Sequence, residues 1–387
     1  MNKNFKFSIL AFALIALGCN FSACEKEIDV VDTSNSDELK AINKQYVEKV
    51  VLPTYASLAD ATIDLHAAIV ALKNNKTEAN LNIVANKWTS TRVYWEESEA
   101  FLFGPVDELG IDPHIDTWPL GVNAFNDLIK NADFIQRINN ENGDKIISSV
   151  ENKDGVLGFH SLEYIIFRNG TVRNINDITE TELIFAVAVA GDLRNQCSLI
   201  EVGWLGESGV SSDKLNYAKR ADNYSLLGTT AQTEYAKKML ETPNGLFTSA
   251  LSSTSTILDG CIDIADEVGA MKLGKPYNGA SDEDKNYIES QYSYNSKVDF
   301  AGNVRSIENA YLGGIPTKRS VSVSDYVKSK DATLDTQVKE AIINAIAKID
   351  AMQDFEINAQ SNSTKEAMEA CLDLNELLEK AKTAIKN

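Results

Sequence analysis

Apolar residues recur three and four positions apart along most of this 387-residue chain, and that spacing favours helices over strands. The clearest seam covers residues 55–72, and two more cover residues 338–352 and 367–378. Residues 80–103 also read as one helix, with two tryptophans a heptad apart. Because no useful stretch alternates apolar and polar residues, the pattern predicts an all-α protein.

The predicted helices fall on both sides of a segment rich in serine, glycine, asparagine and charge, residues 206–231. Such a composition is typical of a crossing between domains. The roughly 350 residues after the N-terminal region are also many for one core. We therefore expect two helical bundle subdomains, residues 39–205 and 232–387.

The N-terminus resembles a bacterial lipoprotein signal peptide, residues 1–24. Two lysines precede an apolar core of ten residues, which is too short to span a bilayer permanently. Cys24 follows small residues as in a lipobox and is the expected lipidation site, because lipidation at Cys19 would leave little apolar core. A plain cleaved signal peptide is the alternative. Residues 25–38 are polar and acidic and read as a tether. These features predict an outer membrane lipoprotein, on the cell surface or the periplasmic face, that is held to the membrane by its lipid alone.

The chain is strongly acidic, with a formal charge of −19. This surplus disfavours nucleic acid and anionic membrane surfaces as partners. It is compatible with cation capture, although acidic surfaces are more often only solubilising. The cysteines beyond the N-terminal segment are too widely spaced for a disulfide framework, so buried packing is expected for them.

Residues 158–167 are expected to form a helix that is apolar nearly all round, and such helices are buried. His160 and Glu163 lie one turn apart in it and would be buried as well. A buried imidazole and a buried carboxylate need hydrogen-bond partners or a metal ion. The simpler alternative is a His–Glu pair that satisfies only itself.

Gly158-x-His160-x-x-Glu163 resembles the signature of the imelysin family. Residues 92–104 and the Trp-Pro loop at 115–120 are similar to two further family segments, and residues 289–313 are similar to its second-half signature. The residues of this sequence that carry these three resemblances include Arg92, Trp118, Glu289, Ser293, Asp299 and Asn303. The resemblance implies two similar bundles with a functional cleft between them, to which both signatures contribute. It also implies a role in iron uptake, with a metal ion or a metal-carrying ligand bound and other iron-uptake proteins as candidate partners.

Carboxylates that converge on the imidazole would make a mixed oxygen–nitrogen site. Such ligands suit iron, zinc or manganese, with iron or zinc the expected metal, and helical bundles build these sites from inward-facing side chains. Four residues are the candidate metal ligands: His160, Glu163, Glu99 and Asp116. Asp116 could instead cap a helix that begins near Pro119. Glu96 shares the helix face of Glu99 but is expected to be solvated.

Imelysins have been classed as peptidases, yet the sequence lacks the usual catalytic motifs. It contains no His-Glu-x-x-His zinc motif and no Gly-x-Ser-x-Gly elbow. Peptidase activity is therefore expected to be weak or absent. Three functions remain open: an iron-uptake component, which is favoured, a metallopeptidase, and a structural or protein-binding lipoprotein whose His–Glu pair is inert.

Overall fold

The computed structural model describes residues 34–228 and 233–386, and most of this part of the chain is helical. Its strands are β1 (Phe167–Arg168) and β2 (Thr171–Val172), which pair antiparallel. Strands of two residues build no layer, so the all-α prediction is confirmed. The predicted signal segment, Cys24 and most of the tether lie outside the described residues.

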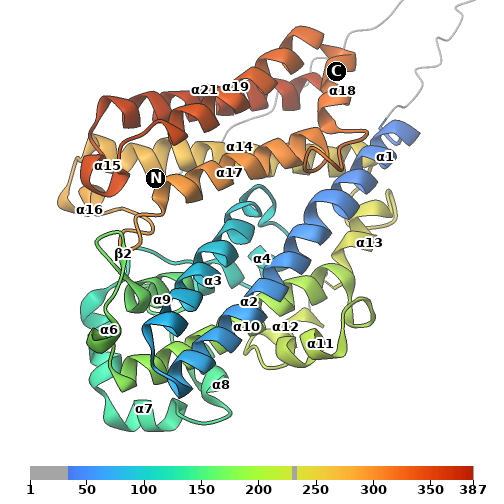
Figure 1. Cartoon of the computed structure of the whole chain (residues 1–387). Helices are drawn as coiled ribbons and strands as arrows, with labels where there is room; N and C mark the ends of the chain where they lie inside the picture. Colours follow the sequence, from blue (N-terminus) through green and yellow to red (C-terminus); the bar gives the residue numbers. More distant parts are fainter. Residues whose placement is uncertain (1–33, 229–232, 387) are drawn as a thin grey trace, which may run out of the picture. The chain divides into compact units, whose positions relative to one another are not determined.

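The N-terminal helices pack around one long buried helix. Their bounds are α1 Asp37–Tyr46, η1 Val47–Val51, α2 Leu52–Asn74, α3 Glu78–Glu96, η2 Glu99–Phe101, α4 Pro105–Glu108, α5 Ile111–Ile115, α6 Val122–Lys130, α7 Ala132–Ile138, α8 Gly143–Ser148, α9 Gly158–Ile166, η3 Ile175–Asp177 and α10 Glu180–Leu205. Helix α10 contacts α2 and α9, and α3 contacts the same two helices (Figure 1). By length and composition alone, α10 and the run Asp37–Asn74 could each cross a membrane, but 94% of the most apolar stretch of α10 is buried within the protein. Helix α10 is therefore accounted for as a core helix.

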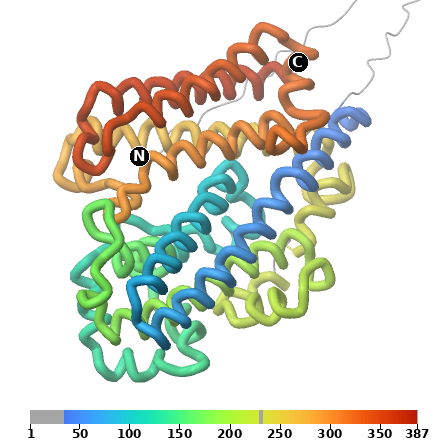
Figure 2. The backbone as a smooth tube through the Cα atoms, viewed as in Figure 1, coloured from blue at the N-terminus to red at the C-terminus, as the bar shows by residue number. Residues whose placement is uncertain are grey.

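The helices after α10 fall into two groups: several of the short ones that follow it directly pack against α10, and the later ones form a second set. Their bounds are η4 Glu207–Gly209, α11 Ser212–Ala218, α12 Tyr224–Leu227, α13 Tyr235–Leu240, α14 Ala250–Asp266, η5 Glu267–Leu273, α15 Gly274–Asn278, α16 Asp282–Lys285, α17 Ser296–Leu312, α18 Val323–Lys330, α19 Ala332–Asp350, α20 Phe355–Asn358 and α21 Asn362–Ala384. Contacts join α14 to α17, α17 to α19, α19 to α21 and α21 back to α14, and Figure 2 shows these orange and red segments running alongside one another. This is the arrangement of a four-helix bundle.

The two sets of helices touch where the sequence signatures lie. Helix α3 packs against α17, and η2 packs against both α14 and α17. Residues 34–387 cluster as one unit by their contacts, so the division into subdomains at 206–231 stays a prediction. Residues on either side of that crossing therefore build the same interior.

The helix expected over residues 80–103 is shorter than predicted, because it ends at Glu96. The hydroxyl and the backbone N–H of Ser98 both donate to the carbonyl of Trp95, which closes the helix end. The chain then turns into η2, a short 3₁₀ helix that begins with Glu99. This turn leaves Glu99 buried beside the interior rather than further along a straight α-helix.

Candidate metal centre

Arg92 lies at the centre of the buried site. It extends from α3 with no exposed surface, and its NH1 group donates to Asp116. Its NH2 group donates to Glu289 at 2.5 Å and forms an ion pair with Glu96. The guanidinium Nε lies 3.6 Å from Asp299. Burial opposes its charge, but these carboxylates raise the pKa of Arg92 well above its usual value, so it is a fixed positive charge.

Helix α9 carries the His160 motif and begins in very close contact with α5. Gly158 has a φ of +63°, and a Cβ atom there would lie 1.8 Å from the carbonyl oxygen of Ile115. Only glycine tolerates that approach and that backbone conformation. The first residue of the motif therefore sets the distance between α9 and the segment that leads into Asp116.

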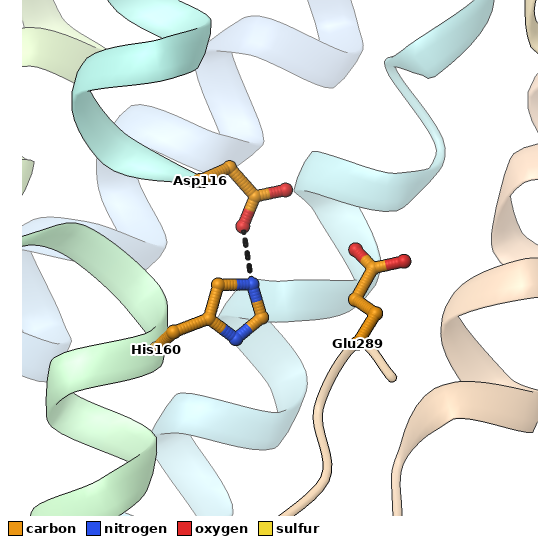
Figure 3. A group of neighbouring side chains, drawn as sticks. All are labelled: Asp116, His160 and Glu289. Carbon is orange, nitrogen blue, oxygen red and sulfur yellow. Dashed lines mark ion pairs between the residues drawn. The ribbon is translucent and has the colours of Figure 1, made fainter. Parts of the chain in front are cut away.

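The two ring nitrogens of His160 face two different carboxylates. Nδ1 is 3.1 Å from Glu163 Oε2, and Nε2 is 3.1 Å from Asp116 Oδ1. Figure 3 shows Asp116 and Glu289 on the same side of the imidazole. Burial opposes protonation of the ring, but the two neighbouring carboxylates raise the pKa of His160 to about 9. The contact between Nε2 and Asp116 lacks hydrogen-bond geometry, so this nitrogen has no hydrogen-bond partner in the part of the chain that the structure describes.

Glu163 joins the first signature to the second. Its Oε1 accepts hydrogen bonds from the backbone N–H of Tyr292 at 2.9 Å and from the N–H and hydroxyl of Ser293, both at 2.8 Å. Its other oxygen faces His160. Among the described residues, no cluster that could hold a cation includes Glu163. Its metal-ligand role stays a prediction, and its contacts favour a role in orienting the imidazole.

Three overlapping clusters have ligand atoms within 4.8 Å of one another. They are Asp116 with His160 and Glu289, Glu96 with Glu99 and Asp116, and Glu96 with Glu289 and Asp299. Glu99 is only 7% exposed, and in the described part of the chain its carboxylate forms no hydrogen bond or close ion pair, although Lys272 lies near enough to oppose the rise of its pKa. A buried carboxylate of this kind needs either a proton or a cation.

Negative charge outnumbers positive charge in this interior. The acidic side chains are Glu96, Glu99, Asp112, Asp116, Glu163, Glu289 and Asp299, and the basic ones are Arg92, His160 and Lys272. Burial raises the pKa of Glu96 and Glu99 well above its usual range, that of Asp112 to about 7 and that of Asp299 to about 6. Burial also opposes the charge on Asp116, but Arg92 outweighs it and lowers the pKa of Asp116 to about 2. The site can therefore neutralise its excess charge by taking up protons or a metal ion.

The donor set fits a metal ion. Hydrogen-bond partners are missing for three buried atoms of the cluster, Glu96 Oε1, His160 Nε2 and Glu289 Oε2, although Arg92 and Lys272 lie nearby. With the unpaired carboxylate of Glu99, these atoms offer oxygen ligands and one imidazole nitrogen. Iron, zinc and manganese all accept this combination.

The structure brings the two sequence signatures together. Glu289 and Asp299 both contact Arg92, and Ser293 binds Glu163. The Asn303 side chain donates to Glu96 Oε2 at 2.5 Å. Trp118 lies at the edge, with its ring centre 4.1 Å from that of Tyr287. Every sequence-predicted motif residue within the described part of the chain therefore belongs to one region.

One expectation and one alternative from the sequence are wrong. Glu96, expected to be solvated, has no exposed surface. Asp116 caps no helix at Pro119, because the next helix, α6, begins only at Val122. Instead, Asp116 follows α5 and accepts a hydrogen bond of 2.6 Å from the Trp95 indole. Its contacts therefore serve the buried site.

Sequence reasoning also missed Lys272, which is 1% exposed and lies 3.1 Å from Glu289. A signal was present, since Cys261, Ala265, Val268 and Lys272 follow the three-and-four spacing of one buried helix face. A lysine at such a seam position indicates a buried acidic partner.

The family model of imelysin, a peptidase family, matches residues 51–381 of this chain. The chain belongs to the imelysin family. It is 26% identical over 305 residues to iron-regulated protein A of Synechococcus elongatus, a match that covers 77% of this chain and 71% of that protein. A crystal structure described as an iron-regulated protein A precursor from Parabacteroides distasonis matches with a TM-score of 0.76 and 26% identity, over 90% of this chain and 95% of that one.

A second solved structure shares the fold at lower identity. The imelysin-like protein of Psychrobacter arcticum matches with a TM-score of 0.58 and 12% identity, over 88% of this chain and 92% of that one. The Synechococcus relative and the Parabacteroides structure are both described as iron-regulated proteins.

Proposed function

We propose that this imelysin is a component of iron uptake that binds a divalent or trivalent metal ion in the buried acidic site. Glu99, Glu96 and Asp116 would hold the ion, with His160 Nε2 and Glu289 at its other side. Carboxylate oxygens and one imidazole suit iron, and zinc and manganese accept the same ligands. Similarity to iron-regulated relatives makes iron the expected cargo.

The observation that carries this proposal is the unpaired carboxylate of Glu99. One of its oxygens lies within 4.8 Å of ligand atoms of Glu96 and Asp116, and among the described residues Lys272 acts on its charge but forms no close ion pair with it. Burying an unpaired carboxylate is costly, and a like-charged neighbour adds to the cost. A bound metal ion would remove both costs at once.

The experiment is a calorimetric titration of the purified protein with Fe²⁺, Zn²⁺ and Mn²⁺. Glu99→Gln keeps the shape of the side chain and removes its charge, so metal affinity should fall at least tenfold, which is about 1.4 kcal/mol or more. Glu97→Gln is the matched control, because Glu97 lies outside the acidic clusters and its charge interacts with that of Arg305. If the wild type binds none of these ions, the acidic site is a structural network of charges and the proposal is wrong.

Attachment to the outer membrane through Cys24 is part of the proposed role, with the soluble body presented to other iron-uptake proteins. Its support is the lipobox-like sequence before Cys24. Labelled palmitate should be incorporated by the wild type and lost in Cys24→Ala. Label that persists in this variant and disappears in Cys19→Ala would move the anchor to Cys19.

Peptidase chemistry is not part of this proposal. Helix α9 supplies one imidazole, His160, to the site. The zinc peptidase motif places two imidazoles on one helix face, with a glutamate between them as the base. Here the nearby Glu163 is engaged by Ser293 and the backbone of Tyr292.

A further inference from the structure

Lys272 extends from η5, a π-helical segment, into the acidic site. Its ammonium lies 3.1 Å from Glu289 Oε2 and 3.5 Å from Glu289 Oε1, and it donates to Asn303 Oδ1 at 3.1 Å. The same Asn303 side chain donates to Glu96. π-Helical turns are often found at functional sites, where the changed register redirects a side chain. Lys272 is thus in direct contact with the acidic cluster.

The ammonium and a bound metal ion would compete for one carboxylate. Glu289 belongs to the group with Asp116 and His160 that could hold a cation, and Lys272 is a positive charge already beside it. Burial opposes that charge, but the carboxylates of Glu289 and Glu99 raise the pKa of Lys272 well above its usual value. Two positive charges on one buried carboxylate repel each other strongly.

A second acceptor for the ammonium lies on the same segment. Glu267 Oε1 is 3.9 Å from Lys272 Nζ, and the Glu267 side chain is 44% exposed. Lys272 therefore lies between an inner, fully buried carboxylate and an outer one that reaches solvent. Its four-carbon stem is flexible enough for a small rotation to move the charge from Glu289 towards Glu267.

We propose that Lys272 is a tethered cation that neutralises Glu289 in the metal-free protein and moves towards Glu267 when a metal ion binds. This inference rests on the proposed metal-binding function. The consequence is selectivity by charge, because a divalent or trivalent ion gains more from the inner carboxylates than a monovalent ion does. Lys272 thereby sets the affinity threshold of the site.

The direct test replaces the ammonium by an apolar group of similar length, in Lys272→Met. Calorimetry with Zn²⁺ and Mn²⁺ should show affinity at least about tenfold tighter than in the wild type. The matched control is Lys275→Met, because the Lys275 ammonium lies 4.0 Å from the ring centre of Tyr287, outside the acidic clusters. It should leave the affinity unchanged. Unchanged or weaker binding by Lys272→Met would overturn the inference, since Lys272 would then support the site rather than compete for it.

Glu267→Gln provides a second test that does not disturb a buried charge. Removing the outer acceptor should weaken metal binding in the wild-type background and have a much smaller effect in the Lys272→Met background. Equal effects in the two backgrounds would show that Lys272 does not move towards Glu267, and the inference would be wrong.

If neither the wild type nor Lys272→Met binds any ion, the proposed function itself fails. If the wild type binds an ion and Lys272→Met fails to tighten it, only this inference fails.

Discussion

The two nitrogens of His160 have different tasks. Nδ1 lies against Glu163, whose other oxygen is held by Ser293 and the backbone of Tyr292. A carboxylate fixed in this way accepts a hydrogen bond from Nδ1 and directs Nε2 towards Asp116 and Glu289, and Nε2 must lose its proton when a metal ion binds, because the pKa of His160 is raised to about 9. The ring is therefore oriented as a metal ligand before any ion arrives.

This arrangement predicts the effect of Glu163→Gln. The amide oxygen can still accept from Ser293, which turns the amide nitrogen towards His160. That donor forces Nδ1 to act as acceptor and places the proton on Nε2, so metal affinity should fall by about 10–100-fold. Calorimetry measures the loss, and circular dichroism should show an unchanged fold. Wild-type affinity in this variant would contradict the orienting role of Glu163.

The acidic residues make the metal-free protein sensitive to pH. Burial raises the pKa of Asp299 to about 6 and that of Asp112 to about 7, and carboxylates raise the pKa of His160 to about 9. A group with a raised folded-state pKa stabilises the fold below its unfolded-state pKa and loses that stability as pH rises through the folded value. The melting temperature of the metal-free protein should therefore fall by several degrees between about pH 4, where the two aspartates lose their protons in the unfolded chain, and about pH 9, where His160 loses its proton in the folded protein.

Metal binding should follow the opposite trend, because ligands must lose their protons. Affinity should rise over the same pH range, and added Zn²⁺ should reverse the loss of thermal stability at the upper end. Asp112→Asn removes one of the titrating carboxyls, so the melting temperature of this variant should change less with pH up to neutral pH than that of the wild type. A metal-free protein whose melting temperature is constant from about pH 4 to pH 9 would show that the two aspartates and His160 do not titrate with these raised pKa values.

At the scale of elements, the position of α9 depends on one glycine. A Cβ at Gly158 would meet the Ile115 carbonyl at 1.8 Å, in a backbone conformation that side chains rarely adopt. Gly158→Ala should therefore lower the free energy of unfolding by about 3 kcal/mol, measured by urea denaturation. Gly110→Ala is the control, because Gly110 has a similar φ of +62° but nothing within 4 Å of its Cβ position. Equal losses in the two variants would mean that backbone strain alone, and not the close contact, is responsible.

Sequence periodicity could predict the helices but not all of their ends. The apolar seam predicted at residues 55–72 lies within α2, and the helix predicted over residues 158–167 is observed as α9. The end of α3 depends on the Ser98 hydroxyl turning back to Trp95, which no apolar pattern records. Burial of Glu96 likewise depends on Asn303, which is 207 positions away in the sequence. Spacing within one helix carries no information about such a partner.

At the scale of the whole molecule, the site exists because the two signatures meet. Arg92 and Glu289 are 197 positions apart, and Glu163 and Ser293 are 130 apart, yet each pair is in contact. The resemblance to imelysins could predict that both signatures contribute, because the family carries them together. It could not predict which carboxylates converge, since that depends on how α3, α9 and the segment before α17 pack. The central claim is that this convergence creates a metal site.

The most direct test is anomalous diffraction from crystals grown with Zn²⁺ or Fe²⁺. One strong peak is expected at about 2.0–2.2 Å from carboxylate oxygens of Glu99 and Asp116, the distance typical of zinc ligands. The peak should be absent from crystals of Glu99→Gln and present in those of Glu97→Gln. An acidic interior without a peak, or a peak only at surface carboxylates, would contradict the metal site and leave a structural network of charges.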